Sequence, residues 1–329
     1  MKPILSIVIP TYNRCNYLKE CLDSIAECSI DSQKKIEVII CNNFSQDKTE
    51  LVINNFIQSN NNINNINVIS SKELIPAQNN WENGINICKT SRILLLSDDD
   101  KVIYRGLDKI IKEALFLKYD LFIGGHFIID SQSKVIAKYN NKNKTYLQET
   151  LMRDLSLRKI RHKLCSIIWN KKLILELKVF SLKYPSNGIC LDGAIMLAAS
   201  NNNKIFTSNN IISAYRVHPN NDCRDGDTNK FLEGRKIFHN YGHSIIQENK
   251  NAYNWFVLWN IYGGIIQAFL SIFRLKEIKT AAKLLKDTAY LQKSIGTITK
   301  KTNFKKPSSL ILISCYFFIK SITFNRKES

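Results

Sequence analysis

Short apolar runs alternate with amphipathic segments over the first hundred residues. The apolar runs are rich in β-branched residues and end in polar residues, which is typical of buried strands. The segments between them repeat apolar residues at helical spacing or begin with a capped helix start. The predicted strands are 4–9, 36–41, 67–70 and 93–96, and the predicted helices are 17–26, one starting at 45–50, and 79–88. This β-α-β-α-β-α-β order predicts an α/β fold with a mostly parallel sheet and right-handed crossovers.

The pattern changes after residue 100, where strands and helices no longer alternate regularly. We interpret 134–144 as a basic loop and 220–230 as a polar loop that could cover a site. The remaining predictions are helices at 107–117, 151–157 and from 186 through 199, and strands at 121–129, 165–169, 204–207 and 211–216. From residue 231 onward the sequence favours helix.

Two late segments raise the question of membrane contact. Residues 255–273 are apolar almost all round, but Asn260 and Gln267 favour a buried or interfacial helix over a membrane span. A basic stretch at 300–306 precedes an apolar stretch at 310–319 that is too short to span. This pair fits either an in-plane membrane anchor or a docked terminal helix with a solvated basic face.

Charge and cysteine content narrow the function classes. The 329 residues carry 47 Lys and Arg against 28 Asp and Glu, a formal net charge of +19. Such a charge favours polyanionic partners. Since the chain lacks zinc-finger spacing and RNA-binding signatures, nucleic acid ranks below anionic lipid and phosphorylated substrates. Nine unpatterned cysteines indicate reduced thiols on the cytosolic side, and Pro10 breaks the N-terminal apolar run too early for a signal peptide.

Three consecutive carboxylates, Asp98, Asp99 and Asp100, follow the apolar run 93–96. They would repel one another strongly unless a cation lay among them. Ligands of open α/β sheets bind beyond the carboxyl ends of the strands, and Mg²⁺ prefers one or two carboxylates together with substrate phosphates. The trio therefore predicts a metal–diphosphate site, with a solvated acidic turn as the alternative.

Three segments in order resemble the family 2 glycosyltransferases, which have the GT-A fold. They are SIVIPTYNR at 6–14, EVIICNNFSQDKT at 37–49 and SDDD at 97–100. Within the family, 74–79 and 215–219 look most like the bacterial O-antigen branch typified by abequosyltransferase. The resemblance implies a GT-A domain over 1–220, with a nucleotide-sugar-binding half (1–100) and an acceptor-binding half (101–220). The resemblance does not extend to 221–329, where the sequence pattern itself predicts a loop and helical region that could associate with a membrane.

The resemblance also implies a donor site. The base and ribose would lie against the end of the first strand, and a second contact would come from the residue after the second strand, where the family usually has Asp and this chain has Asn42. Asn keeps hydrogen-bonding capacity but loses the charge, which leaves the identity of the base open. The expected donor-binding residues are Pro10, Thr11, Tyr12, Arg14, Asn42, Asn43, Asn79, Asp98 and Asp99.

The metal, expected to be Mn²⁺ or Mg²⁺, would bridge the donor diphosphate. The family pattern fits either Asp98 with Asp99 or Asp98 with Asp100, and alternation along an extended segment favours Asp98 and Asp100. By resemblance, His218 is the further metal or diphosphate contact.

Asp192 stands where the family has its catalytic base, although the usual Glu-Asp pair is Leu191-Asp192 here. A base at this position would take the proton of the acceptor hydroxyl. The structural alternative is an N-cap of the helix that follows. His126, after two glycines, is a candidate for the acceptor cleft.

The resulting hypothesis is an inverting, metal-dependent hexosyltransferase. The resemblance implies a nucleotide-diphosphate sugar as donor and a saccharide as acceptor, expected on a lipid carrier at the inner face of the cell membrane, in the synthesis of a bacterial surface polysaccharide such as O-antigen or capsule. Three alternatives stay open: a nucleotidyltransferase, although 10–16 lacks a Gly-rich phosphate loop; a non-catalytic, membrane-peripheral sugar-nucleotide- or glycan-binding module; and nucleic-acid binding through charge. The sequence does not identify the sugar, base, acceptor or linkage.

Overall fold

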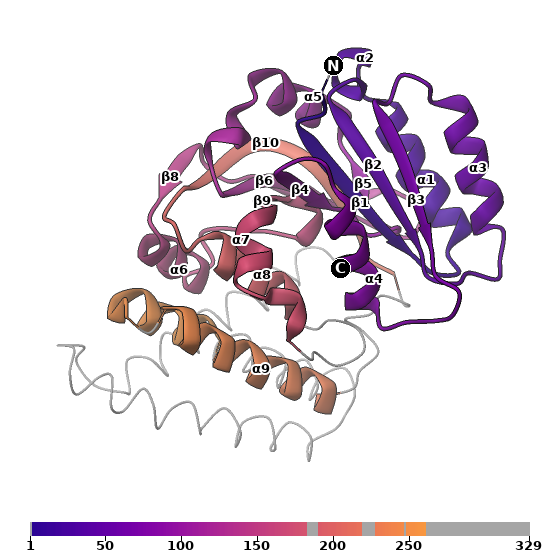
Figure 1. Ribbon diagram of the computed structural model, residues 1–329. Coiled ribbons are helices and arrows are strands. Elements are labelled where there is room, and N and C mark those ends of the chain that lie inside the picture. Colours follow the sequence, from indigo (N-terminus) through magenta and orange to yellow (C-terminus); the bar gives the residue numbers. More distant parts are fainter. Residues whose placement is uncertain (1, 183–189, 219–227, 247, 261–329) are drawn as a thin grey trace.

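The computed structural model describes residues 2–182, 190–218, 228–246 and 248–260, which fold around one ten-stranded sheet (Figure 1). The strand order is β3-β2-β1-β4-β9-β6-β10-β5, with β7 paired to β6 and β8 to β10. The first half comprises β1 (Leu5–Thr11), α1 (Cys15–Ala26), α2 (Ile30–Gln33), β2 (Ile36–Asn42), α3 (Thr49–Ser59), β3 (Asn65–Ser70), α4 (Ala77–Ile87) and β4 (Arg92–Leu95). The second comprises β5 (Lys101–Val102), α5 (Tyr104–Glu113), β6 (Leu121–Ile129), β7 (Val135–Tyr139), β8 (Lys144–Tyr146), α6 (Gln148–Ser156), β9 (Ile167–Asn170), α7 (Lys171–Glu176), α8 (Leu191–Ala199), β10 (Ile205–Arg216) and α9 (Thr228–Ile246).

The first four strands form the parallel sheet that the apolar runs predicted. β1 pairs in parallel with both β2 and β4, and β2 pairs in parallel with β3. Every residue of β2 is buried, as expected for a strand covered on both faces. The predicted α/β fold with a parallel sheet in its first half is therefore confirmed. In the second half, β6 and β10 are parallel, whereas β9 is antiparallel to both β4 and β6.

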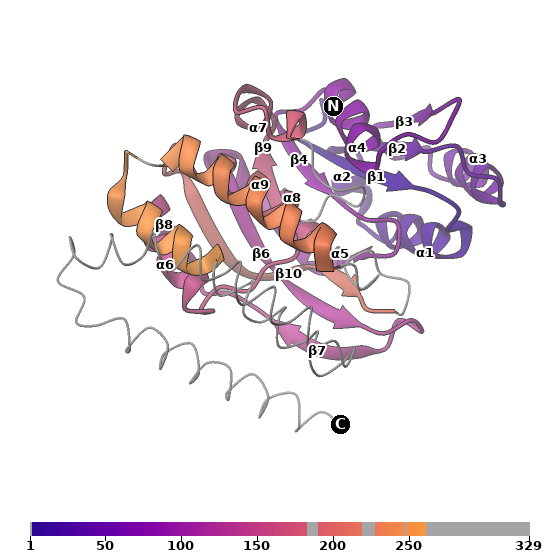
Figure 2. The same ribbon diagram turned by 90° about the horizontal axis from the view of Figure 1, so that it is seen from below.

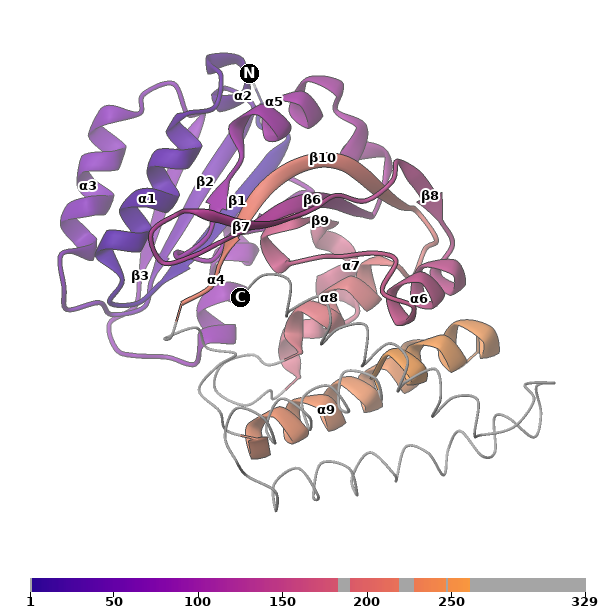
Figure 3. The same ribbon diagram turned by 180° about the vertical axis from the view of Figure 1, so that it is seen from behind.

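Helices cover both faces of the sheet, and alternate residues of β1 face the two layers. Ile7 and Ile9 pack with apolar residues of α1, α3 and α5, while Val8 packs with residues of α4, α6, α8 and α9. Figure 3 shows α1 and α3 in front of the first strands, and Figure 2 shows α9 lying across α8. Eight of the nine residues of α8 are fully buried or nearly so, because this helix lies between the sheet and α9.

The chain reverses direction across the sheet between β1 and β4. It passes from β1 to β2 to β3 on one side and then returns to place β4 on the other side of β1. Val8 accepts a hydrogen bond from the backbone N–H of Leu96 (2.9 Å), and Pro10 faces the same side two residues later, beyond the end of β4. Because proline has no backbone N–H and no β4 residue lies opposite Pro10, the sheet loses no hydrogen bond at this position. Such a switch point is where open α/β sheets bind ligands.

Two predictions for the second half were wrong. The basic stretch predicted as a loop contains the edge strand β7, in which Val135 and Ile136 are about half exposed. The two predicted strands at 204–207 and 211–216 are one strand, β10, with register shifts between Thr207 and Ser213. The polar residues between the two apolar parts are accommodated by this irregularity and do not end the strand.

The membrane predictions fall largely on residues that the structure leaves undescribed. Among the residues that are described, none of the helices combines the length and hydropathy that a membrane span requires. The apolar segment 255–273 continues beyond residue 260, and the segments 300–306 and 310–319 lie outside the described ranges, as does most of the loop 220–230. The division into domains stays a prediction.

Candidate active site

Asp98 and Asp99 lie in a turn directly after β4, at the switch point between β1 and β4. Arg14, the residue before α1, brings its Nη1 atom to 3.2 Å from Oδ1 of Asp98 and 3.1 Å from Oδ2 of Asp99. The side chain of Arg14 is a quarter exposed, whereas those of the two aspartates are buried. The carboxyl ends of two neighbouring strands therefore place two carboxylates and a guanidinium together.

His218 joins this cluster from the end of β10. Its Nε2 atom lies 2.9 Å from Oδ2 of Asp99, and its ring lies 5.0 Å from the ring of Tyr17 on α1. The sequence expectation that His218 belongs to the site stays a prediction, but the geometry brings it to one of the three aspartates.

Asp100 is engaged by a different partner, the backbone of Arg216. Its Oδ1 atom accepts the backbone N–H of Arg216 at 2.8 Å. The preference for Asp98 and Asp100 as metal ligands assumed an extended segment. Residues 98 and 99 instead form a turn, closed by a hydrogen bond from the backbone N–H of Asp100 to the carbonyl of Ser97 (3.0 Å). Strand alternation therefore does not apply, and Asp99 takes the place facing His218.

Burial makes the negative charges of Asp98 and Asp100 costly. Burial, together with the charge of Asp99, raises the pKa of Asp98 to about 7, although Arg14 acts in the opposite direction. Burial and the charge of Asp99 raise the pKa of Asp100 well above its usual range, against the effect of the N–H of Arg216. A bound cation would relieve both effects.

The loops after β1 and β2 are tied to each other. Oδ1 of Asn13 accepts the backbone N–H of Gln46 (2.7 Å), and Oδ2 of Asp47 accepts the backbone N–H of Cys15 (2.9 Å). Arg14 lies between Asn13 and Cys15, so these two bonds fix its backbone relative to the loop that follows β2. Both residues lie in the segments that carry the family resemblance, but the sequence assigned neither of them a role of its own.

Asn42 and Asn43 line the same edge but are engaged locally. Oδ1 of Asn42 accepts the backbone N–H of Ser45 (3.1 Å). Asn43 exchanges two hydrogen bonds with the backbone of Ile75, at 2.8 and 3.1 Å. Both side chains thus fix loops around the proposed nucleoside position.

The other predicted donor residues differ in exposure. Pro10 and Thr11 end β1, and Thr11 is buried, while Tyr12 is 42% exposed at the rim. Asn79 lies on an exposed face of α4. Pro10, Thr11 and Tyr12 therefore share the edge with Arg14, whereas no hydrogen bond or ion pair between Asn79 and the aspartates is seen in the described part of the chain.

Asp192 lies in the first turn of α8 and is not its N-cap, because Cys190 occupies that position. Its Oδ1 atom accepts a hydrogen bond from the backbone N–H of the next residue, Gly193, at 2.8 Å. This is the one hydrogen bond of its side chain that is seen among the described residues. The carboxylate acts electrostatically on His162, whose neighbour Lys163 acts on Asp100. The consecutive residues His162 and Lys163 therefore interact electrostatically with the candidate base and with the acidic turn, respectively.

His126 is buried on β6, and its ring lies 5.5 Å from that of Tyr139. Burial lowers the pKa of His126 to about 3, and the charges of Lys163, His162 and Arg161 act in the same direction. His126 is therefore neutral near pH 7. Its place in an acceptor cleft stays a prediction.

The side chains of this cluster fit a divalent cation that takes its remaining ligands from phosphate oxygens. Asp99 and His218 offer an oxygen and a nitrogen 2.9 Å apart, and Asp98 is adjacent. Among the described residues, no three His, Cys, Asp or Glu side chains are arranged to hold a metal by themselves. Mg²⁺ and similar ions at phosphate sites use one or two carboxylates plus substrate oxygens, so a partial protein shell is what such a site needs.

Sequence reasoning missed Glu20 and Tyr17 on α1. Arg14, Tyr17 and Glu20 are spaced three residues apart, which places them along one side of the start of α1. Arg216, at the end of β10, contacts both. The interval was visible in the sequence, but the partner lies almost 200 residues away.

The family model for Glycosyl transferase family 2 matches residues 6–176, slightly more than half of the chain. The chain is 24% identical over 185 residues to a Campylobacter jejuni GalNAc(5)-diNAcBac-PP-undecaprenol beta-1,3-glucosyltransferase, covering 56% of this chain and 57% of that protein. The chain spans about half the length of the curated relatives it matches first.

Two solved structures share the fold at low sequence identity. Staphylococcus aureus TarS, residues 1–349 with UDP-GlcNAc, aligns with a TM-score of 0.65 and 14% identity, covering 88% of this chain and 81% of that one. The mannosyltransferase PcManGT of Pyrobaculum calidifontis, with GDP-Man and Mn²⁺, aligns with a TM-score of 0.52 and 12% identity, covering 93% and 89%.

Proposed function

This chain belongs to glycosyl transferase family 2, and from that membership we propose that it is an inverting, metal-dependent enzyme that moves a sugar from a nucleoside-diphosphate donor to a saccharide. The observation that carries the proposal is the meeting of Asp98, Asp99, Arg14 and His218 at the sheet's switch point. Family membership decides against the nucleotidyltransferase alternative.

In this proposal Asp99 and His218 would hold the cation, with Asp98 beside them. When bound, Mn²⁺ or Mg²⁺ would supply positive charge at the leaving diphosphate. Arg14 adds a guanidinium beside the same position. Pro10, Thr11 and Tyr12, with the loops held by Asn42 and Asn43, border the nucleoside. A solved neighbour of this fold contains Mn²⁺ with a nucleoside-diphosphate sugar, which supports this choice of donor and ion.

Asp192 is the proposed general base. It would accept the proton of the acceptor hydroxyl while that oxygen attacks the anomeric carbon opposite the leaving group. Attack from the opposite side gives inversion. Asp192 lies in the first turn of α8 without serving as its N-cap, and its Oδ1 atom accepts the N–H of Gly193, so Oδ2 is the oxygen that we assign to the acceptor proton.

We further propose a lipid-linked saccharide as acceptor, used at a membrane surface. The Campylobacter jejuni relative is named as a glucosyltransferase for a saccharide linked to undecaprenol diphosphate. The net charge of +19 favours an anionic lipid surface, where each basic residue near the surface contributes on the order of 1 kcal/mol.

The test begins with a thermal-shift screen of UDP-, CDP-, GDP- and dTDP-sugars with Mn²⁺ or Mg²⁺, because a ligand that binds the folded state raises its melting temperature. The stabilising donor is then incubated with short saccharides and with lipid-linked ones, with and without EDTA. Metal-dependent transfer with inverted anomeric configuration is expected. Stabilisation without turnover on any acceptor would instead support a non-catalytic binding module.

A further inference from the structure

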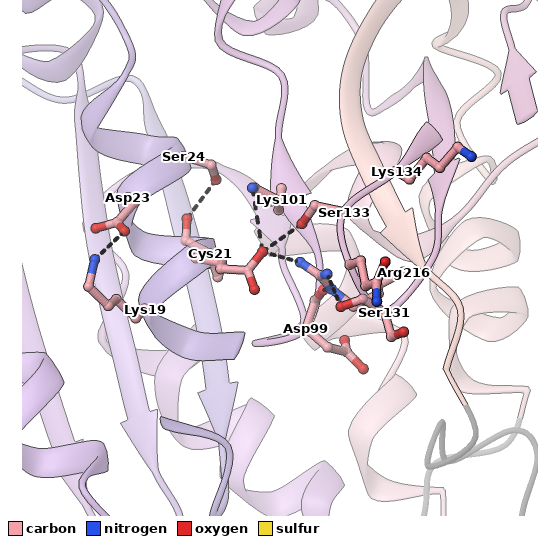
Figure 4. A network of polar contacts seen from close by, with 12 residues as sticks. Lys19, Cys21, Asp23, Ser24, Asp99, Lys101, Ser131, Ser133, Lys134 and Arg216 are labelled. Atoms are coloured by element: carbon pink, nitrogen blue, oxygen red, sulfur yellow. Dashed lines mark hydrogen bonds and ion pairs between the residues drawn. The ribbon is translucent and has the colours of Figure 1, made fainter. Parts of the chain in front are cut away.

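The guanidinium of Arg216 is wholly buried and joins four parts of the fold. Nε donates to the carbonyl of Asp99 (2.6 Å), and Nη1 lies 3.3 and 3.2 Å from the carbonyls of Asp130 and Ser131 (Figure 4). Nη2 donates to Oε2 of Glu20 at 2.8 Å. The acidic turn, the β6–β7 connection, α1 and β10 therefore meet at one side chain.

Arg216 fixes the acidic turn from both its side chain and its backbone. The side chain holds the carbonyl of Asp99, and the backbone N–H of Arg216 donates to the carboxylate of Asp100. His218 follows two residues later and contacts the carboxylate of Asp99. The separation between Asp99 and His218 is thus set by the residue that anchors both segments.

Glu20 holds Arg216 in place. The same Oε2 atom receives the hydroxyl of Ser133 (2.6 Å) and lies 3.6 Å from Nζ of Lys101. Although burial acts to raise the pKa of Glu20, the hydrogen bonds of Ser133 and Arg216 and the charges of Arg216 and Lys101 lower it below its ordinary value. Glu20 is therefore ionised near neutral pH.

Tyr17 adds a second contact from the same helix. The guanidinium carbon of Arg216 lies 4.8 Å from the centre of its ring, which also packs near the ring of His218. Helix α1 thus contacts His218 through Tyr17 and Arg216 through Glu20. Arg14, the residue before this helix, contacts the acidic turn itself.

We propose that Glu20 and Arg216 are positioning residues that set the distance and orientation of Asp99 and His218 for a divalent cation and a diphosphate. The proposal rests on the function proposed above, and it assigns neither residue a contact with substrate. A buried ion pair by itself is weak support for stability, since such pairs are often replaceable by apolar residues. Four oriented acceptors around one planar guanidinium fit a positioning role better than a general stabilising one.

The test uses Mn²⁺ with inorganic pyrophosphate as a probe, titrated calorimetrically into the full-length protein, so that neither the base nor the sugar needs to be known. Loss of groups that orient ligands typically costs about 10–100-fold in metal affinity. We expect Glu20→Ala to weaken binding by about tenfold or more, and Glu20→Gln, which keeps an acceptor for Arg216, to recover part of the loss. Arg216→Lys keeps the charge but not the fork, and should weaken binding at least as much.

Asp23→Asn is the matched control. Asp23 lies on the same helix and pairs with Lys19 at 2.6 Å, but both side chains are more than half exposed (Figure 4). It should bind the probe as the unchanged protein does. Because Arg216→Lys risks misfolding, the Glu20 variants, at a side chain 38% exposed, decide the result if that protein does not fold.

The two proposals fail differently. If the unchanged protein binds Mn²⁺–pyrophosphate and folded Glu20→Ala binds it equally well, the positioning role is overturned while the proposed function stands. If the unchanged protein does not bind the probe, the cation–diphosphate site is absent and both fall. Graded weakening in the order Gln, then Ala, with unchanged melting temperatures, supports the positioning role.

Discussion

The imidazole of His218 lies 2.9 Å from the carboxylate of Asp99, although 119 residues separate the two in the chain. One sits in the turn after β4 and the other follows β10, so the contact joins the two halves of the sheet. It also distinguishes Asp99 from Asp100, whose carboxylate is engaged by the backbone of Arg216.

The first prediction separates these two aspartates. Asp99→Asn removes the charge facing His218, and we expect transfer to fall by about 10²-fold or more, as for other lost electrostatic groups at a reacting phosphate or oxyanion. Asp100→Asn keeps an oxygen that can accept the N–H of Arg216, so its loss should be less than about tenfold. The measurement is the transfer rate of both variants at saturating sugar donor over a series of Mn²⁺ concentrations. If both variants lost the same fraction of activity, Asp100 would also have to be counted as a metal ligand.

The second prediction concerns Asp192. Asn at this position can still accept the N–H of Gly193, so Asp192→Asn should fold and bind donor normally. Transfer should fall by about 10²–10⁴-fold, the usual contribution of a general base. The donor-induced thermal shift serves as the internal control. A folded variant that transfers sugar at a near-normal rate would remove the assignment.

The third prediction concerns acid stability. The pKa of His126 is lowered to about 3 in the folded protein from an ordinary value of 6.5. Below pH 6.5 the unfolded chain takes up a proton at this residue that the folded state does not, so stability should decline as the pH falls from 6.5 toward 3. The slope from one such group is at most about 1.4 kcal/mol per pH unit.

His126→Gln should flatten this part of the stability curve, measured by urea unfolding at a series of pH values. The same substitution at His243, which is exposed, controls for removing an imidazole from the surface. An unaltered slope in His126→Gln would show that other groups cause the acid sensitivity.

The fourth prediction concerns how closely α5 sits on β10. A Cβ added at Gly106 would lie 1.8 Å from the backbone carbonyl oxygen of Ile211, which a side-chain rotation cannot relieve. Gly106→Ala should therefore destabilise the protein by at least about 2 kcal/mol. Lys109→Ala, on an exposed position of the same helix, should change stability by less than about 0.5 kcal/mol. Chemical denaturation measures both, and equal stabilities would contradict the close packing.

The first half of the fold could be predicted because parallel strands covered on both faces need continuous apolar runs. Ile36–Asn42 shows this directly, since every residue is buried. The edge strand β7 lacks that signal, because Val135, Ile136 and Lys138 are exposed and only Ala137 and Tyr139 are partly buried. Its basic composition therefore resembled a loop. The polar middle of β10 likewise hid the continuity of that strand.

The candidate site divides in the same way. Segments 6–14 and 97–100 could be located from the sequence because strand ends and carboxylate runs are local features. The choice between Asp99 and Asp100 depended on whether 98–99 is extended or a turn, which periodicity does not determine. The pairing of Glu20 with Arg216 spans 196 residues and has no local signal at all.

One nitrogen of Arg14 bridges the two carboxylates of the acidic turn, at 3.2 Å from Asp98 and 3.1 Å from Asp99. A cation held at these carboxylates would share them with a fixed positive charge, so its apparent affinity would reflect repulsion from the guanidinium as well as attraction to the carboxylates. The same guanidinium would attract an anionic ligand of that cation. One residue would therefore disfavour the bare metal ion and favour the ion together with a diphosphate.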